Sequence, residues 1–262
     1  MFTSNPFAAL SATISPAVIQ GYVILMVALV VLGTLIDVIH KKSAKYFFEN
    51  AEKAKAARER EVGGGEMATI AIQTIAEDVL TSAEFCNPKR RIAHLLTMYG
   101  FIAFVVTTIL LVFCYTTKAA PAIVVQLWHL GALMVCVGGY WFWFFIRVDV
   151  AAEGNPWYRI IRADLFVLSL LATTTFGLIW SVLQAKGAGG ATTLFLALFI
   201  ISSSVLFGGV LWSKFAHMFF KPAAAFQKRV AKANGSRENL PLPADAPATM
   251  GLGIKRDLPR HY

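Results

Sequence analysis

Long apolar runs constrain this chain more than any other feature of its sequence. Hydrophobic residues make up 57% of the 262 positions and charged residues only 15%, and the apolar residues gather in blocks. A helix needs about 20 residues to cross a hydrocarbon core of roughly 30 Å. Five blocks reach that length, at about 17–39, 93–115, 121–146, 164–184 and 190–218. The sequence therefore predicts an integral membrane protein.

These blocks are expected to be helices rather than strands. Backbone amides inside a lipid bilayer must be paired within the membrane, and a helix does this inside a single segment. The blocks lack the two-residue alternation that is typical of membrane barrel strands. We therefore predict an all-α, five-helix bundle. The first block is expected to stay as a span, because the residues ahead of it lack the basic start of a cleaved signal peptide.

The basic residues are distributed unevenly between the two ends of the blocks. With the N-terminus outside, only Lys118 and Lys186 of the 24 lysines and arginines lie on the outer face. The positive-inside rule then predicts an outer N-terminus and an inner C-terminus. This asymmetry and attraction to lipid head groups account for the net charge of +9. We do not expect a nucleic-acid partner.

The chain is expected to have four parts, of which two lie on the cytoplasmic side. The cytoplasmic loop begins with an alternating-charge run typical of a helix, is interrupted by the glycines at 63–65, and continues with apolar residues at helical spacing. The tail starts with the basic stretch FQKRVAK, passes through the proline-rich PLPADAP and ends in GLGIKRDLPRHY, which has no apolar periodicity. Because it has no means of folding alone, it is expected to be either disordered or a docking strap for a partner. The parts are an N-terminal segment with the first span (1–40), a cytoplasmic helical loop (41–92), a four-helix core (93–218) and a cytoplasmic tail (219–262).

Two histidines are expected at the same depth in the membrane. His94 follows a basic cluster at 89–91, one turn into the second block, and His217 lies near the end of the fifth block. Because these two helices run in opposite directions, both imidazoles are expected near the inner face. Two imidazoles from opposite sides can ligate the iron of a b-type haem. We therefore predict His94 and His217 as haem ligands.

Nearby residues agree with a haem, although each has another explanation. Arg91 and Lys214 each lie three residues from one of these histidines and are candidate partners for the haem propionates. Gly100 and the glycine pair at 208–209 remove side chains where the edge of the macrocycle would approach. Glycines also serve close helix packing, and cations also gather at inner helix ends.

Two stretches resemble signature segments of a five-helix cytochrome b family. They are RRIAHLLTMYGFIAFVVTT at 90–108 and LWSKFAHMFF at 211–220. The family includes the gamma subunit of respiratory nitrate reductase and the membrane subunits of quinone-interacting, heterodisulfide-reductase-linked and sulfite-reductase-linked complexes. The resemblance covers roughly 90–220. It implies haem ligands on the second and fifth helices and exchange of electrons with a quinone.

The resemblance also implies that this chain holds one haem b rather than two. Members with two haems carry a second histidine pair, whose slots fall here near Phe104 and near 199–200, and neither slot holds a histidine. The remaining pair is the inner one. His129, in the outer half of the third block, is a displaced ligand or quinone contact, or else a histidine satisfied by packing against a neighbouring helix.

These features together predict an electron-transfer subunit of a bacterial inner membrane. It would pass electrons between a cytoplasmic oxidoreductase and the quinone pool, and it is not the catalytic subunit, because flavin, nucleotide and cluster motifs are missing from the sequence. The stretch DVLTSAEFCNPKRR resembles the membrane anchors linked to adenylylsulfate reductase. This implies a partner from sulfur metabolism, docked by 41–92 and 219–262. The alternative is a haem-free membrane anchor or scaffold that docks a soluble redox enzyme.

Overall fold

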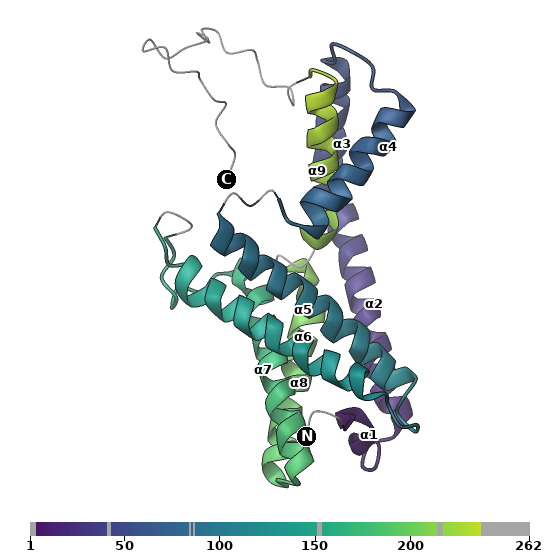
Figure 1. Cartoon of the computed structure of the whole chain (residues 1–262), viewed down its shortest axis with the longest axis vertical. Coiled ribbons are helices and arrows are strands. Elements are labelled where there is room, and N and C mark those ends of the chain that lie inside the picture. The colour runs from purple at the N-terminus through teal and green to yellow at the C-terminus, as the bar shows by residue number, and fades with distance from the viewer. Residues whose placement is uncertain are drawn as a thin grey trace. The chain divides into compact units, whose positions relative to one another are not determined.

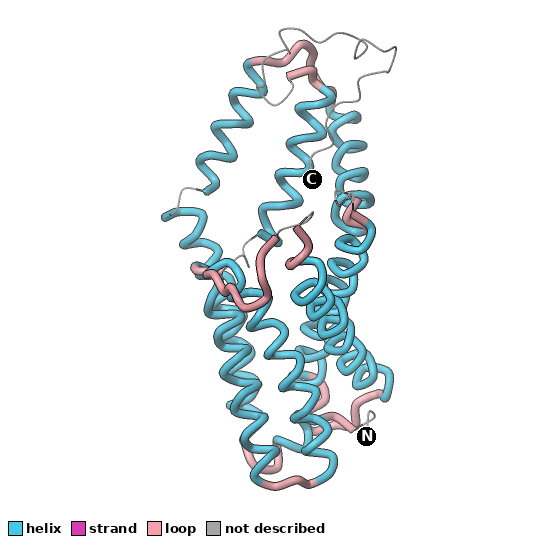
Figure 2. Tube along the Cα trace, turned by 90° about the vertical axis from the view of Figure 1, so that its left-hand side faces the viewer, coloured by secondary structure: helices cyan, strands magenta, loops and turns pink. Residues whose placement is uncertain are grey.

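The structure, a computed structural model, describes residues 4–40, 43–83, 85, 87–150, 154–213 and 217–236. Regular structure over these residues is helical (Figure 2). Five helices are long and apolar enough to cross a membrane: Pro16–Ile39, Pro88–Phe113, Ala122–Ile146, Arg162–Lys186 and Gly190–Leu211. The predicted all-α, five-helix membrane fold is thus confirmed, whereas the orientation in the bilayer stays a prediction.

The chain divides into two compact units. The first, here called the membrane unit, comprises Met1–Lys41 and Asn87–His217. The second, here called the helical loop unit, comprises Lys42–Cys86 and Met218–Tyr262.

The membrane unit contains a short helix and the five spans. Helix α5 packs along α6 and helix α7 along α8 (Figure 1). In chain order its elements are α1 (Pro6–Leu10), α2 (Pro16–His40), α5 (Pro88–Phe113), α6 (Ala122–Trp141), the π-helical turn η2 (Phe142–Ile146), the 3-10 turn η3 (Arg162–Asp164), α7 (Leu165–Lys186), α8 (Gly190–Gly208) and the 3-10 turn η4 (Gly209–Leu211).

The start of α5 and the end of α7 follow directly from local sequence. The Asn87 side chain accepts hydrogen bonds from the backbone N–H groups of Lys89 and Arg90, and Pro88 occupies the first helical position. Both residue types are favoured at these positions. Helix α7 ends where Gly187 takes a left-handed conformation with φ of 67°, which glycine adopts without steric cost.

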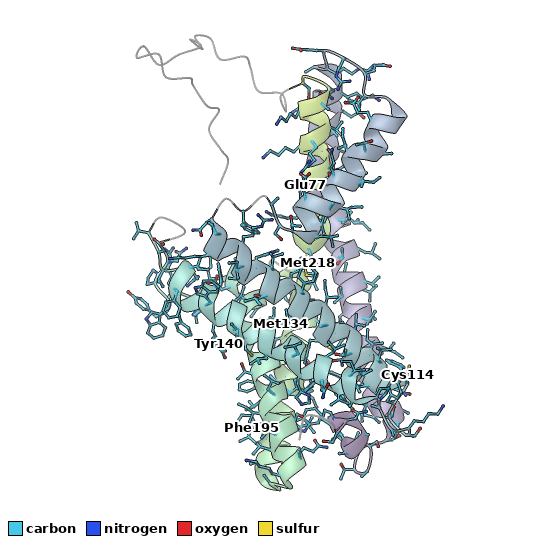
Figure 3. All side chains as sticks on the ribbon, viewed as in Figure 1. Glu77, Cys114, Met134, Tyr140, Phe195 and Met218 are labelled. Atoms are coloured by element: carbon cyan, nitrogen blue, oxygen red, sulfur yellow. The ribbon has the colours of Figure 1, made fainter. Side chains whose placement is uncertain are left out.

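Glycines allow the backbones of α5 and α6 to approach each other closely. A Cβ atom at Gly100 would lie 2.7 Å from the carbonyl oxygen of Gly131, and one at Gly131 would lie 2.7 Å from the Phe104 nitrogen. A Cβ atom at Gly138 would lie 2.6 Å from the carbonyl oxygen of Ala93. The two backbones therefore touch directly, as small residues allow in membrane helix pairs. Met134, labelled on α6 in Figure 3, packs beside Gly100.

The fifth span differs from the expectation of one continuous helix over 190–218. Helix α8 ends at Gly208, tightens into a 3-10 turn at Gly209–Leu211, and His217 begins a new helix. Each glycine in a helix interior costs about 1 kcal/mol relative to alanine, so two in succession favour termination there. The fifth span is therefore shorter than the apolar block at 190–218: it ends at Leu211.

The helical loop unit is built from the loop between the first two spans and the beginning of the tail. Its helices are α3 (Ser43–Ala56), α4 (Gly64–Gln73), the π-helical turn η1 (Thr74–Leu80) and α9 (His217–Ala233). The two helical patterns expected in the loop are confirmed. The break between them falls at 57–63, and α4 begins at the second of the three glycines.

Charged and polar contacts join the tail helix to the loop inside this unit. Arg229 on α9 donates to Asp78 at 2.6 Å and to Glu77 at 2.7 Å, and these contacts raise the pKa of its guanidinium above the usual range. At the end of α9, the Asn234 carbonyl accepts from the Glu59 and Arg60 nitrogens. We expected 41–92 and 219–262 as separate segments, but the described part of the tail folds with the loop.

Replacing Gly131 by alanine tests the backbone contact between α5 and α6. The new Cβ would meet backbone atoms, which cannot move aside, so we expect a loss of about 1 to 3 kcal/mol of stability from overpacking. The matched control is Gly21→Ala in α2, where a Cβ atom meets nothing within 4 Å. Thermal unfolding in detergent should show a lower Tm for Gly131→Ala and an equal or higher Tm for Gly21→Ala. Equal Tm values for both variants would contradict the contact.

Replacing Arg229 by glutamine tests the docking of the tail helix. Asp78 is only 11% exposed at its side chain, so losing its cation leaves a partly buried carboxylate with fewer donors, at a cost of about 1 to 3 kcal/mol. Amide hydrogen exchange in α9 should accelerate. Lys228→Gln, at an exposed position of the same helix, should leave the exchange unchanged. The same acceleration in both variants would mean that general charge, not this contact, holds the helix.

Candidate functional site

His94 and Arg91 lie in the first turns of α5. Both side chains are partly exposed, whereas Ala93 between them is buried against Gly138 of α6. Helix geometry places residues three apart on one face, so Arg91 and His94 share a face of α5 that differs from the α6 contact. If His94 ligated a haem iron, Arg91 on the same face could reach a propionate of that haem.

The other half of the predicted haem site falls largely outside the described residues. Lys214 is not among them, and the side chain of His217 is not described either. The backbone of His217 begins α9, beyond Leu211, where the last span ends. The expectation that His217 lies within a continuous fifth helix is therefore corrected, and its pairing with His94 stays a prediction.

The structure favours the packing explanation for Gly100. The space beside its α carbon is taken by the backbone of α6 at Gly131 and by Met134, so a macrocycle edge could not approach there. At Gly208 and Gly209, a Cβ atom would meet only side-chain atoms of Leu29 and Leu165, at 3.8 and 3.5 Å. These are ordinary contact distances, and the two glycines act mainly by ending α8.

The two positions that the resemblance assigns to a second histidine pair face each other here, and both are filled by aromatic rings. Phe104 on α5 and Phe199 on α8 are both buried, and their ring centroids are 6.5 Å apart in an edge-to-face arrangement. Trp128 packs on Phe104 at 5.2 Å, and Trp180 stacks on Phe199 at 5.6 Å. Aromatic pairs at such distances contribute about 0.5 to 1.5 kcal/mol beyond burial.

The short helix α1 closes this aromatic cluster, which we define as Phe7, Phe104, Trp128, Trp180 and Phe199. The Phe7 ring lies 5.8 Å from that of Trp128 and 5.4 Å from that of Trp180, edge-on to both. Five large rings therefore occupy the region between the two slots. A second haem would have to displace these rings, and the expected single haem b on the inner side stays a prediction.

His129 is held by the protein at both ring nitrogens. Its Nδ1 lies 2.8 Å from the carbonyl oxygen of Val125, one turn earlier in α6, and its Nε2 lies 2.8 Å from Oγ of Ser181 on α7. The side chain is buried. The alternative of a histidine satisfied by a neighbouring helix is confirmed. Ligation of a metal through either nitrogen would require one of these bonds to break.

Arg147 is a buried charge whose role could not be read from the sequence. Its guanidinium donates to the carbonyl oxygens of Pro156 and Arg159 at 3.0 and 2.7 Å and pairs with Asp164 at 2.5 Å. It also lies 4.1 Å from the ring centroid of Trp143. Because Arg147 and Asp164 are 17 residues apart, no local pattern pairs them. The arginine fixes the connection between α6 and α7.

Comparison with family models, with curated proteins and with solved structures found no match. Membership of the five-helix cytochrome b family therefore stays a prediction carried by the two quoted stretches of the sequence.

Arg147→Gln tests whether this connection depends on the buried guanidinium. Removing one partner of a buried ion pair costs about 3 to 5 kcal/mol, because the remaining charge is left uncompensated. We expect a clearly lower Tm in detergent. Arg162→Gln, at an exposed position of the same connection, should change the Tm little. A small effect of Arg147→Gln would show that the connection is held by other contacts.

Proposed function

We propose that this chain is a haem b membrane subunit that passes electrons between a cytoplasmic oxidoreductase and the membrane quinone pool. The observation that carries the proposal is the contrast between the two ends of the bundle. Where two-haem members of the resembled family hold a second haem, Phe104 and Phe199 pack against each other here. At the opposite end, His94 stays partly exposed on a spanning helix, with Arg91 on the same face.

The residues of this chain have separate roles in the proposal. His94 from α5 and His217 from the start of α9 would hold the iron, and Arg91 and Lys214 would pair with the propionates. A bound haem supplies reversible one-electron transfer. The aromatic cluster excludes water from the opposite half of the bundle. Gly100 serves the contact between α5 and α6 and has no part in the cofactor site.

The helical loop unit supports docking of a soluble partner. It presents apolar side chains to solvent, with Phe48 64%, Ile72 67% and Ile75 56% exposed. Contiguous exposed apolar patches mark surfaces for protein contact, and these three side chains are the candidates for one in this unit. By the resemblance, the partner would be a cytoplasmic redox enzyme of sulfur metabolism, such as adenylylsulfate reductase, at a bacterial inner membrane.

A second candidate function is a haem-free membrane anchor that docks the same kind of enzyme. One observation favours it: the last span ends at Leu211, so His217 belongs to a different helix from the spanning residues. In this case the helical loop unit would act alone, and His94 would have no ligand role.

Alanine substitution of each proposed ligand distinguishes the two functions. With protein produced in haem-replete cells, we expect the wild type to show a Soret band, and His94→Ala or His217→Ala to lower the haem content at least about tenfold. Both variants should still insert, because alanine is well tolerated in helices. The measurement is the pyridine haemochrome content per purified chain.

His40→Ala is the matched control, since His40 also stands at the end of a span and is not a proposed ligand. It should keep the wild-type haem content. A wild-type protein without a Soret band would overturn the haem proposal and leave the anchor function. Haem retained by both ligand variants would show that other residues hold the iron.

A further inference from the structure

Four exposed rings lie in contact on the surface of the membrane unit, where α6 leads into its connection with α7. The rings of Tyr140 and Phe144 are stacked, with centroids 6.1 Å apart. Trp157 lies 6.3 Å from Phe144 and 5.8 Å from Tyr158. We call these four residues the exposed aromatic row; Tyr140 is labelled on α6 in Figure 3. Their side chains are 39% to 70% exposed, and large apolar groups exposed together mark a contact surface.

The row continues an aliphatic face of α6. Leu133 and Val137, two turns and one turn before Tyr140, share its side of the helix and are each 52% exposed. This span ends at Ile146, and the next begins at Arg162. The face is therefore aliphatic in the middle of the span and aromatic at its end. Tryptophan and tyrosine are enriched at that level, where hydrocarbon meets the lipid head groups.

Two arginines follow the row. Residues 157–162 read WYRIIR, and all six are exposed. The acidic residues of the connection lie outside this stretch, at 149, 153 and 164, and Asp164 is paired with Arg147. In the part of the chain that the structure describes, Arg159 has one long side-chain hydrogen bond, 3.5 Å to Asn155, and Arg162 has none. Both guanidinium groups are therefore available to a ligand.

The backbone that carries these arginines is held from inside the protein. Arg147, only 1% exposed, donates to the carbonyl oxygens of Pro156 and Arg159. Asp164 accepts from the Ile161 nitrogen at 3.0 Å. Three residues of chain span at most about 11 Å, so Arg159 and Arg162 are close enough for both side chains to meet one phosphate group. A surface whose backbone is already fixed loses little entropy on binding.

We propose that this face binds one anionic phospholipid of the surrounding membrane. The acyl chains lie along Leu133, Val137 and the exposed aromatic row, and the phosphate accepts hydrogen bonds from Arg159 and Arg162. The order of aliphatic, aromatic and cationic side chains matches the order of chain, glycerol and phosphate in the lipid. Guanidinium groups bind phosphate through paired hydrogen bonds. A head group without an amine is favoured, because two arginines repel a further cation.

The experiment is native mass spectrometry of the purified full-length protein, delipidated in detergent. The probes are palmitoyl-oleoyl phosphatidylglycerol and palmitoyl-oleoyl phosphatidylcholine, which have the same chains and differ in the charge of the head group. We expect one phosphatidylglycerol per chain to bind at least about tenfold more tightly than phosphatidylcholine. The double variant Arg159→Gln/Arg162→Gln should lower the affinity for phosphatidylglycerol about tenfold or more, because hydrogen bonds to a charged group are lost.

The matched control is the double variant Lys118→Gln/Lys186→Gln. It removes the same number of exposed cations from the connections at the opposite ends of these spans, and it should leave lipid binding unchanged. Trp157→Ala tests the rings separately: it should weaken both lipids and keep the preference for phosphatidylglycerol. The Tm of each variant without lipid shows whether it is folded, and we expect it to stay near the wild-type value because all of these side chains are exposed.

Two outcomes would overturn the inference. One is equal affinity of the wild type for the two lipids, and the other is an equal loss of binding in the arginine and lysine variants. Either result would leave this face to a partner other than a lipid. The inference does not depend on the haem proposal, and haem content is measured on the same samples. A wild-type protein without haem that still prefers phosphatidylglycerol would remove the haem proposal and leave the lipid site standing.

Discussion

Direct contact between the backbones of α5 and α6 is the constraint on which the rest of the membrane unit depends. Apolar side chains gain little by leaving lipid for another helix, so close packing has to hold the spans together. Gly100 and Gly131 permit that packing, and a Cβ atom at either would strike the opposite backbone. The same contact places Phe104 next to Gly131. From this position the Phe104 ring packs on Trp128 in the aromatic cluster.

An aromatic cluster fills the half of the bundle that the predicted orientation puts on the outer side. Phe104, Trp128, Trp180 and Phe199 pack together where a second haem would need open space between two helices. Beside the cluster, the buried side chains of His129 on α6 and Ser181 on α7 are hydrogen-bonded to one another. Redox chemistry is therefore proposed for the His94 end of the bundle.

Much of the fold could be predicted because lipid imposes strict rules on sequence. The five spans were visible as apolar blocks, and the helices of the loop were visible from spacing. The site was less predictable. Gly100 looked the same in sequence whether it faced a cofactor or another helix, and His129 gave no sign of its partner Ser181, 52 residues away. The end of the last span at Leu211 depended on how strongly Gly208 and Gly209 terminate a helix.

The sequence by itself determined that this chain crosses the membrane five times as helices, because only continuous apolar segments with internally paired backbones are stable in lipid. It also determined that Phe104, Phe199 and Ile200, the positions that the resemblance assigns to a second histidine pair, are not histidines. Only the tertiary structure decided that those slots meet and are filled, that Arg147 is neutralised by Asp164, and that the beginning of the tail folds with the loop. Each of these depends on contacts between residues far apart in the chain, which no local pattern encodes.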